Sequence, residues 1–183
     1  MKHALAVFLI KQVFTDGEQK EKNPMTSTSV PIIREAGQGE TIYLSEAMYQ
    51  IWKATGETTR GAADIWVEVV PPQMGPPEHM HARYDESFLV VKGTFLFKAA
   101  GNLRQVSEGA WVFIPGGIAH AFRNIGTETG QLLIETFPGG IRKYFEETSA
   151  LLMSEPVDQQ ALERVNERHG VVFVGPPLAE EGH

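Results

Sequence analysis

Between residues 40 and 137 the chain alternates between short apolar runs and strong turn signals. Within several runs apolar and polar side chains alternate, which is the pattern of half-buried strands. Repeated short strands of this kind are typical of an all-β sandwich or barrel and not of a βαβ chain. Breakers separate the runs at Pro71-Pro72, Gly93, Gly109 and Pro115-Gly116-Gly117. The predicted strands are TIYL, AMYQIWK, ADIWVEVVP, ESFLVVKG, TFLFKAAGN, LRQV, GAWVFIP, AHAFRN and QLLIETF.

After Phe137 the pattern becomes helical. Apolar side chains recur at helical spacing, with charged residues on the opposite face; the apolar face comprises Ile141, Tyr144, Phe145, Thr148, Leu151 and Leu152. Pro156 ends this predicted helix. Asp158 has the side chain of an N-cap for a second helix, which Gly170 ends. We therefore predict two helices packed outside the barrel, followed by an extended tail.

These patterns divide the chain into three regions. Residues 1–29 are predicted to be an N-terminal extension and flexible linker, 30–140 the β-barrel, and 141–183 the helices and tail. The apolar start is too short for a signal peptide, because Lys11 follows it at once and no small-x-small cleavage site comes after it. No run reaches the roughly 18 apolar residues of a membrane span. We expect a cytoplasmic protein without membrane contact.

Composition narrows the classes of partner. The 183 residues fit one domain, and 16 Lys and Arg against 23 Asp and Glu give a net charge of −7. No basic cluster interrupts this acidic balance, so nucleic acid is not an expected partner. The chain has no cysteine, which removes thiolate ligands and cysteine nucleophiles. Any metal must be held by nitrogen and oxygen atoms.

Two histidines and a carboxylate stand beside an apolar strand in the segment GPPEHMHARYDESFLVVKG. Residues i and i+2 of a strand share a face and lie about 6.6–7 Å apart. His79 and His81 can therefore reach one point. The short ARYD passage lets the next strand present Glu86 to the same point.

Asp85 competes with Glu86 for the role of this carboxylate. Strand alternation favours Glu86, because it shares a face with Phe88 and Val90. Asp85 is then a solvated turn residue.

A third histidine follows in the segment GAWVFIPGGIAHAFRN. After the turn at Pro115, a strand carries His120, Phe122 and Asn124 on one face. His120 beside His79, His81 and Glu86 makes a three-histidine, one-glutamate site. Such a site suits one divalent transition metal ion, which we expect to be Fe, Mn, Ni, Co, Cu or Zn. Four protein ligands leave two positions of an octahedral ion open, which is a catalytic arrangement.

Both segments resemble the paired motifs of the cupin superfamily. The second matches the family pattern at Gly109, Pro115, Gly117, His120 and Asn124, and the first matches at His79, His81, Glu86 and Gly93. The first departs at its opening glycine, since Gln73 occupies that position and the glycine stands at residue 75. The resemblance implies a cupin-type jelly-roll β-barrel with the metal inside, held by His79, His81, Glu86 and His120.

A weaker resemblance extends to the segments ETFPGGIRKYFEE and GPPL, which are similar to single-domain cupins related to quercetin 2,3-dioxygenase. It implies a metal-dependent dioxygenase that acts on a small aromatic hydroxy-ketone, of flavonol type, and uses dioxygen. Glu86 would serve as ligand and catalytic base. Phe88 and Phe122 share faces with the ligands, so we expect them to bind the substrate, together with Met74 at the barrel mouth. The family also implies a homodimer, formed through the N-terminal segment or a barrel edge.

Three alternatives remain open from the sequence. The chain could be a metal cupin of other chemistry, such as an isomerase, decarboxylase or hydrolase. It could also be a non-enzymatic binder of small molecules. Phe88 and Phe122 could equally be ordinary barrel core, because small barrels fill their interiors with side chains.

Overall fold

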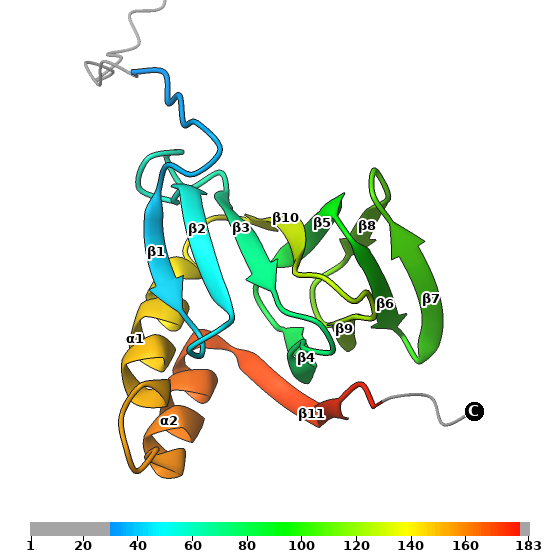
Figure 1. Ribbon diagram of the computed structural model, residues 1–183. Helices are drawn as coiled ribbons and strands as arrows, with labels where there is room; N and C mark the ends of the chain where they lie inside the picture. Colours follow the sequence, from blue (N-terminus) through cyan, green and yellow to red (C-terminus); the bar gives the residue numbers. More distant parts are fainter. Residues whose placement is uncertain (1–29, 180–183) are drawn as a thin grey trace, which may run out of the picture. The chain divides into compact units, whose positions relative to one another are not determined.

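A computed structural model describes residues 30–179 of the chain (Figure 1). The predicted extension and linker, residues 1–29, lie outside the described residues. From Ile32 onward the described residues belong to one compact unit. Its elements are β1 (Glu40–Tyr43), β2 (Tyr49–Ala54), β3 (Asp64–Val70), β4 (Pro77–His81), β5 (Asp85–Lys92), β6 (Thr94–Ala99), β7 (Asn102–Ser107), β8 (Trp111–Ile114), β9 (His120–Asn124), β10 (Gly130–Phe137), α1 (Arg142–Leu152), α2 (Gln159–His169) and β11 (Val171–Pro177).

The strands form two antiparallel sheets. One sheet has six strands in the order β1-β2-β3-β10-β5-β8, and the other has five in the order β11-β4-β9-β6-β7. Strands that are neighbours in the chain repeatedly fall in different sheets, so the chain crosses between the sheets many times. The prediction of a mostly β jelly roll with two C-terminal helices is confirmed.

Alternation of side chains along the strands builds the core between the sheets. In β10 every second residue is buried, among them Leu132 and Ile134. Aromatic rings from both sheets meet there: Phe88 of β5 lies 5.1 Å from Phe97 of β6 and 5.9 Å from Phe122 of β9, centroid to centroid. These edge-on contacts add to the hydrophobic stabilisation of burying the rings.

The two helices have the predicted caps and largely the predicted faces. The Asp158 carboxylate accepts a hydrogen bond from the Ala161 backbone N–H at 2.9 Å, and Gly170 ends α2 in a left-handed conformation at φ 71°. Tyr144 and Thr148 of α1 are buried. Leu152, expected on the apolar face, is 40% exposed, because it lies at the end of α1 beside an open pocket described below.

The phenyl ring of Phe145 attaches α1 to the barrel. It lies 5.4 Å from the Trp66 ring and 6.0 Å from the Trp52 ring. At the outer edge of the sheet, the Ser149 hydroxyl donates to the Tyr43 carbonyl at 2.7 Å, so α1 runs beside β1 (Figure 1). Helix α1 therefore covers the part of the interior that β1, β2 and β3 leave open.

The extended tail predicted after Gly170 is a strand of the five-stranded sheet. Val171, Val172 and Phe173 of β11 pair with His81, Met80 and His79 of β4. The tail thus flanks the strand that carries two of the four candidate ligands. Within residues 30–179 no helix is long and apolar enough to cross a membrane.

Candidate metal centre

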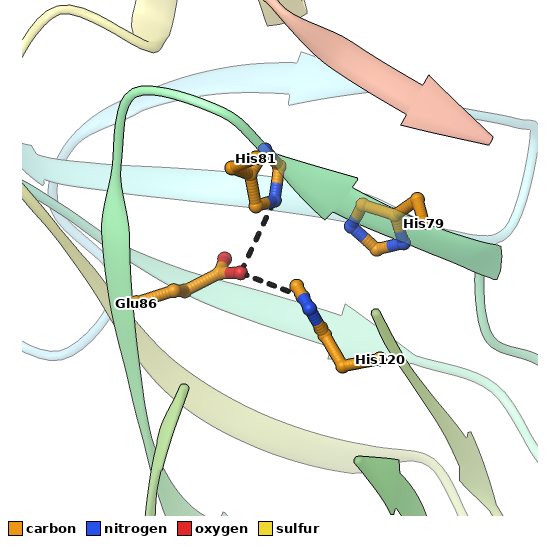
Figure 2. A group of neighbouring side chains, drawn as sticks. All are labelled: His79, His81, Glu86 and His120. Carbon is orange, nitrogen blue, oxygen red and sulfur yellow. Dashed lines mark hydrogen bonds and ion pairs between the residues drawn. The ribbon is translucent and has the colours of Figure 1, made fainter. Parts of the chain in front are cut away.

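Three strands from both sheets deliver the four predicted ligands to one place (Figure 2). His79 and His81 come from β4, and His120 begins β9, where it pairs directly with His79. Glu86 comes from β5 in the opposite sheet. The ligand atoms of all four side chains lie within 4.8 Å of one another. The site therefore lies between the two sheets.

A turn fixes the ends of the strands that carry these residues. The Gly117 backbone N–H donates to the His81 carbonyl at 2.8 Å, and the Gly116 N–H donates to the Asp85 carboxylate at 2.8 Å. Asp85 is exposed, whereas Glu86 points inward and is 4% exposed. The structure thus places Glu86 with the histidines and Asp85 on the turn.

Two of the histidines have a fixed proton position. His79 Nδ1 lies 2.9 Å from the Pro77 carbonyl oxygen, and His120 Nδ1 lies 3.0 Å from the Ile118 carbonyl oxygen. A carbonyl only accepts hydrogen bonds, so each Nδ1 carries the proton and donates it. In neutral imidazole Nε2 then carries a lone pair. Hydrogen bonds of this kind orient metal-binding histidines in proteins.

The Nε2 atom of His120 faces the carboxylate of Glu86. The distance from His120 Nε2 to Glu86 Oε2 is 3.0 Å. With Nδ1 already protonated, a neutral His120 would direct its Nε2 lone pair at a carboxylate oxygen. Either a proton or a cation must lie between these two atoms, because two lone pairs at that distance repel each other.

The surroundings of His81 also indicate a bound cation. Its side chain is 3% exposed, and Nε2 lies 3.2 Å from Glu86 Oε2. That approach lacks the angle of a hydrogen bond, and among the described residues neither ring nitrogen has a hydrogen-bond partner. Buried polar atoms without partners are costly. A metal ion would satisfy them, so the donor set fits a bound transition metal.

The protonation states of the ligand side chains favour a bound cation. Burial alone would raise the pKa of Glu86, but the neighbouring His81 and the hydrogen bond with His120 outweigh it and hold that pKa below its ordinary range. Burial, together with the neighbouring His81 and His120, lowers the pKa of His79 to about 3. At neutral pH the site therefore offers a charged carboxylate and a neutral His79. A metal ion would compete with protons for this site.

An inner pocket of about 60 Å³ lies against three of the ligands. Phe88 and Phe122, which we expected to bind substrate, line it, while Met74 packs against the core and does not line it. The complete lining is Leu44, Met48, Gln50, Trp66, Glu68, Pro76, His79, His81, Glu86, Phe88, Phe122, Ile134 and Phe145. Substrate binding by Phe88, Phe122 and Met74 stays a prediction.

Gln50 and Glu68 in this lining were missed by the sequence reasoning. The sequence does contain a signal for Glu68. It stands in the apolar strand DIWVEVV, two residues from Trp66 and two from Val70, so the three side chains share one face of the strand. Carboxyl groups are rarely buried among inward-facing apolar residues unless they have a partner or a function.

An outer pocket of about 290 Å³ adjoins the inner one. His79, His81, Leu44, Met48, Pro76 and Phe145 line both pockets. Tyr144 and Leu152 of α1, Leu162 of α2 and Phe173 of β11 complete most of the apolar wall. The outer pocket gives the metal centre a largely apolar approach between the helices and β11.

A larger cleft of about 570 Å³ contains none of the four ligands. Its prominent charges have partners within the protein: Arg142 pairs with Glu40 and Glu146, and Lys53 donates to three backbone carbonyls. We therefore place the candidate function at the inner pocket and not at this larger cleft.

Comparison with known proteins agrees with this geometry. Residues 66–134 match the family described as "Cupin domain" (Cupin_2). An uncharacterized protein of Aquifex aeolicus is 41% identical over 46 residues, which cover 25% of this chain and 38% of that protein. The match thus spans well under half of that relative.

Solved structures share the fold at low sequence identity. A predicted oxalate decarboxylase from Thermotoga maritima has a TM-score of 0.52 at 17% identity, over 60% of this chain and 99% of the other. KdgF from a Halomonas species has a TM-score of 0.51 at 15% identity, over 57% and 92%. Residues 66–134 thus match the cupin domain, and the chain has a two-sheet fold in which four converging side chains form a candidate three-histidine, one-glutamate metal site.

Proposed function

We propose that this cupin is a metal-dependent enzyme, and that it dioxygenates a small aromatic hydroxy-ketone in the manner of quercetinase-like cupins. The observation that supports it best is the pair of facing acceptor atoms on His120 and Glu86, 3.0 Å apart, which favours a bound cation. When bound, the ion would supply a Lewis-acidic centre with room for a chelating substrate and dioxygen.

The residues of the chain have separate tasks in this proposal. His79, His81 and His120 supply neutral nitrogen ligands, and Glu86 leaves a divalent ion with one uncompensated positive charge. That charge favours a substrate whose chelating oxygen has lost its proton. Glu86 remains our candidate for the group that accepts this proton.

The two pockets suit a molecule with a polar end and an apolar end. A chelating hydroxy-ketone would place its oxygen atoms at the ligands in the inner pocket. Its ring would extend past Phe145 into the outer pocket, against the apolar side chains of α1, α2 and β11. Water would be excluded from the reacting end by the ring itself.

Oxygen consumption tests the reaction type. Protein loaded in turn with Fe²⁺, Mn²⁺, Co²⁺ or Ni²⁺ is mixed with flavonols and smaller hydroxy-ketones in an oxygen electrode. We expect uptake above the Glu86→Ala control. Substrate loss without oxygen uptake would instead indicate the isomerase, decarboxylase or hydrolase alternative. A ligand that raises Tm without being consumed would indicate a non-enzymatic binder.

We also propose a cytoplasmic homodimer. The cysteine-free sequence supports the location. The apolar side chains of Leu89, Val91, Trp111 and Phe113 on the outer side of β5 and β8 support self-association, because large exposed apolar patches mark interaction surfaces.

A further inference from the structure

Two strands bring two matched pairs of side chains to the interior beside the metal centre. Gln50 of β2 lies directly opposite Glu68 of β3, and Trp52 lies opposite Trp66. The two indole rings stack with centroids 4.9 Å apart and an interplanar angle of 20°. All four side chains are buried. They form a rigid inner wall of the barrel.

Hydrogen bonds fix the orientation of the Gln50 amide. Trp52 Nε1 donates to Gln50 Oε1 at 3.1 Å. Because an indole N–H is only a donor, the amide oxygen must face it and the amide nitrogen must point away. Gln50 is fully buried, and within the described part of the chain its Nε2 makes no hydrogen bond of normal geometry. The amide donor thus lies beside Glu68, whose pKa it lowers, without forming a hydrogen bond of normal geometry.

Glu68 is held in the corresponding way on the neighbouring strand. Trp66 Nε1 donates to Glu68 Oε2 at 2.8 Å, which orients the carboxyl group. Burial raises the pKa of Glu68 to about 7, against the opposing effect of the Trp66 and Gln50 side chains and with help from the Glu86 charge. Near neutral pH the carboxyl group can therefore either accept or donate a hydrogen bond.

Gln50 and Glu68 line the same inner pocket as His79, His81 and Glu86. A buried amide donor without a well-formed hydrogen bond and a buried carboxyl group both lower the stability of a fold. Two apolar side chains would fill the same wall without that cost. Convergent polar groups in an otherwise apolar pocket are typical of ligand recognition.

We propose that Gln50 and Glu68 form a hydroxyl-binding subsite, so that the ligand carries an alcohol or phenol group in the inner pocket in addition to its chelating oxygen atoms. The inference rests on the proposed function for the chelating end. A hydroxyl group accepts from Gln50 Nε2 and donates to Glu68, which satisfies both residues. An ammonium group has no acceptor for Gln50, and a carboxylate would be repelled by Glu68 whenever Glu68 is ionised.

The test uses 3-hydroxypyran-4-one as the parent chelator, together with derivatives that carry one extra hydroxyl or hydroxymethyl group at each free ring position. Binding to the Zn²⁺-loaded protein is measured by calorimetry, since Zn²⁺ has no redox chemistry. We expect at least one derivative to bind about tenfold more tightly than the parent. In Gln50→Met and Glu68→Gln that advantage should fall to about twofold or less. The tenfold advantage should persist in the control variant Gln105→Met, whose substitution lies on exposed strand β7.

The outcomes separate the two proposals. If the parent does not bind the Zn²⁺-loaded wild type, the proposed chelating function fails and the subsite fails with it. If the parent binds but no derivative gains affinity, or if the gain survives both substitutions, only the subsite is overturned. Should Gln50→Met not fold, Gln50→Glu keeps an acceptor for Trp52 and removes the amide donor, and the same loss of advantage is expected.

Discussion

His120 and Glu86 meet between the two sheets with Nε2 and Oε2 3.0 Å apart, although His120 already donates its Nδ1 proton to the Ile118 carbonyl. In the protein without metal, a second proton on the imidazole satisfies this contact, and the pairing with Glu86 raises the pKa of His120 despite its burial. A metal ion would replace that proton. Affinity for the ion should therefore depend on the charge of Glu86.

Glu86→Gln should weaken metal binding by at least about 100-fold, since the amide keeps the shape of the side chain but not its charge. Asp85→Asn is the matched control, because Asp85 is exposed and its carboxylate accepts a hydrogen bond from the turn at Gly116; it should retain the metal within about threefold of wild type. Competition with a chromophoric chelator measures both constants. Equal loss of metal in the two variants would contradict the assignment of Glu86 as the ligand.

Glu68→Gln should change how stability depends on pH. The pKa of Glu68 is raised from its ordinary 4.5 to about 7 in the folded protein. Its contribution is fully present below pH 4.5 and is lost as the pH rises through about 7, because only the unfolded state ionises freely between these values. The wild type should therefore lose about 3 kcal/mol relative to Glu68→Gln over this range.

Urea unfolding of both proteins without metal, at intervals from pH 4 to pH 8, measures the difference. The ligand side chains are present in both proteins, so their own effects cancel in the comparison, and what remains is Glu68 together with its coupling to Glu86. Parallel stability curves for the two proteins would show that Glu68 does not titrate in this range.

Phe145→Ala should destabilise the protein by about 2–4 kcal/mol, because it removes the ring that joins α1 to Trp52 and Trp66. Leu103→Ala, at an exposed position on β7, should cost less than about 1 kcal/mol. Denaturant unfolding measures both. A cost as small as that of Leu103→Ala would mean that α1 is held to the barrel by other contacts.

Trp111→Lys should abolish the proposed dimer. Trp111 is 63% exposed and stacks on Phe113 with centroids 5.9 Å apart, and it pairs with Leu89 across β5 and β8. Placing a charge at the centre of an apolar interface should weaken association by about 100-fold or more. Light scattering coupled to size-exclusion chromatography measures the mass, with Leu103→Lys on β7 as control. A wild type that is monomeric at every concentration would refute the dimer.

The sequence was sufficient to predict what depends on local spacing. His79 and His81 share a face because of strand alternation, and the same rule separates Glu86 from Asp85. Asp158 and Gly170 mark the ends of α2 by their backbone and capping preferences. These features need only the residues near them in the chain.

What the sequence did not predict depends on pairing between distant strands. The opposition of Gln50 to Glu68 follows from the register of β2 and β3, which no local pattern reports. Met74, predicted to lie at the barrel mouth, packs against the core and does not line the inner pocket. Phe145 lines both pockets, although its spacing indicated only that it lies on the apolar face of a helix.

The pairing of β11 with β4 has a consequence for biosynthesis. β4 contacts β9 in register at a single pair, His79 with His120, whereas β11 pairs with it at four positions, including both histidines. Val171 leaves the ribosome 90 residues after its partner His81. During translation β4 therefore cannot pair with β11 until the other strands and both helices have been synthesised. We expect the nascent chain to bind its metal ion only late in synthesis.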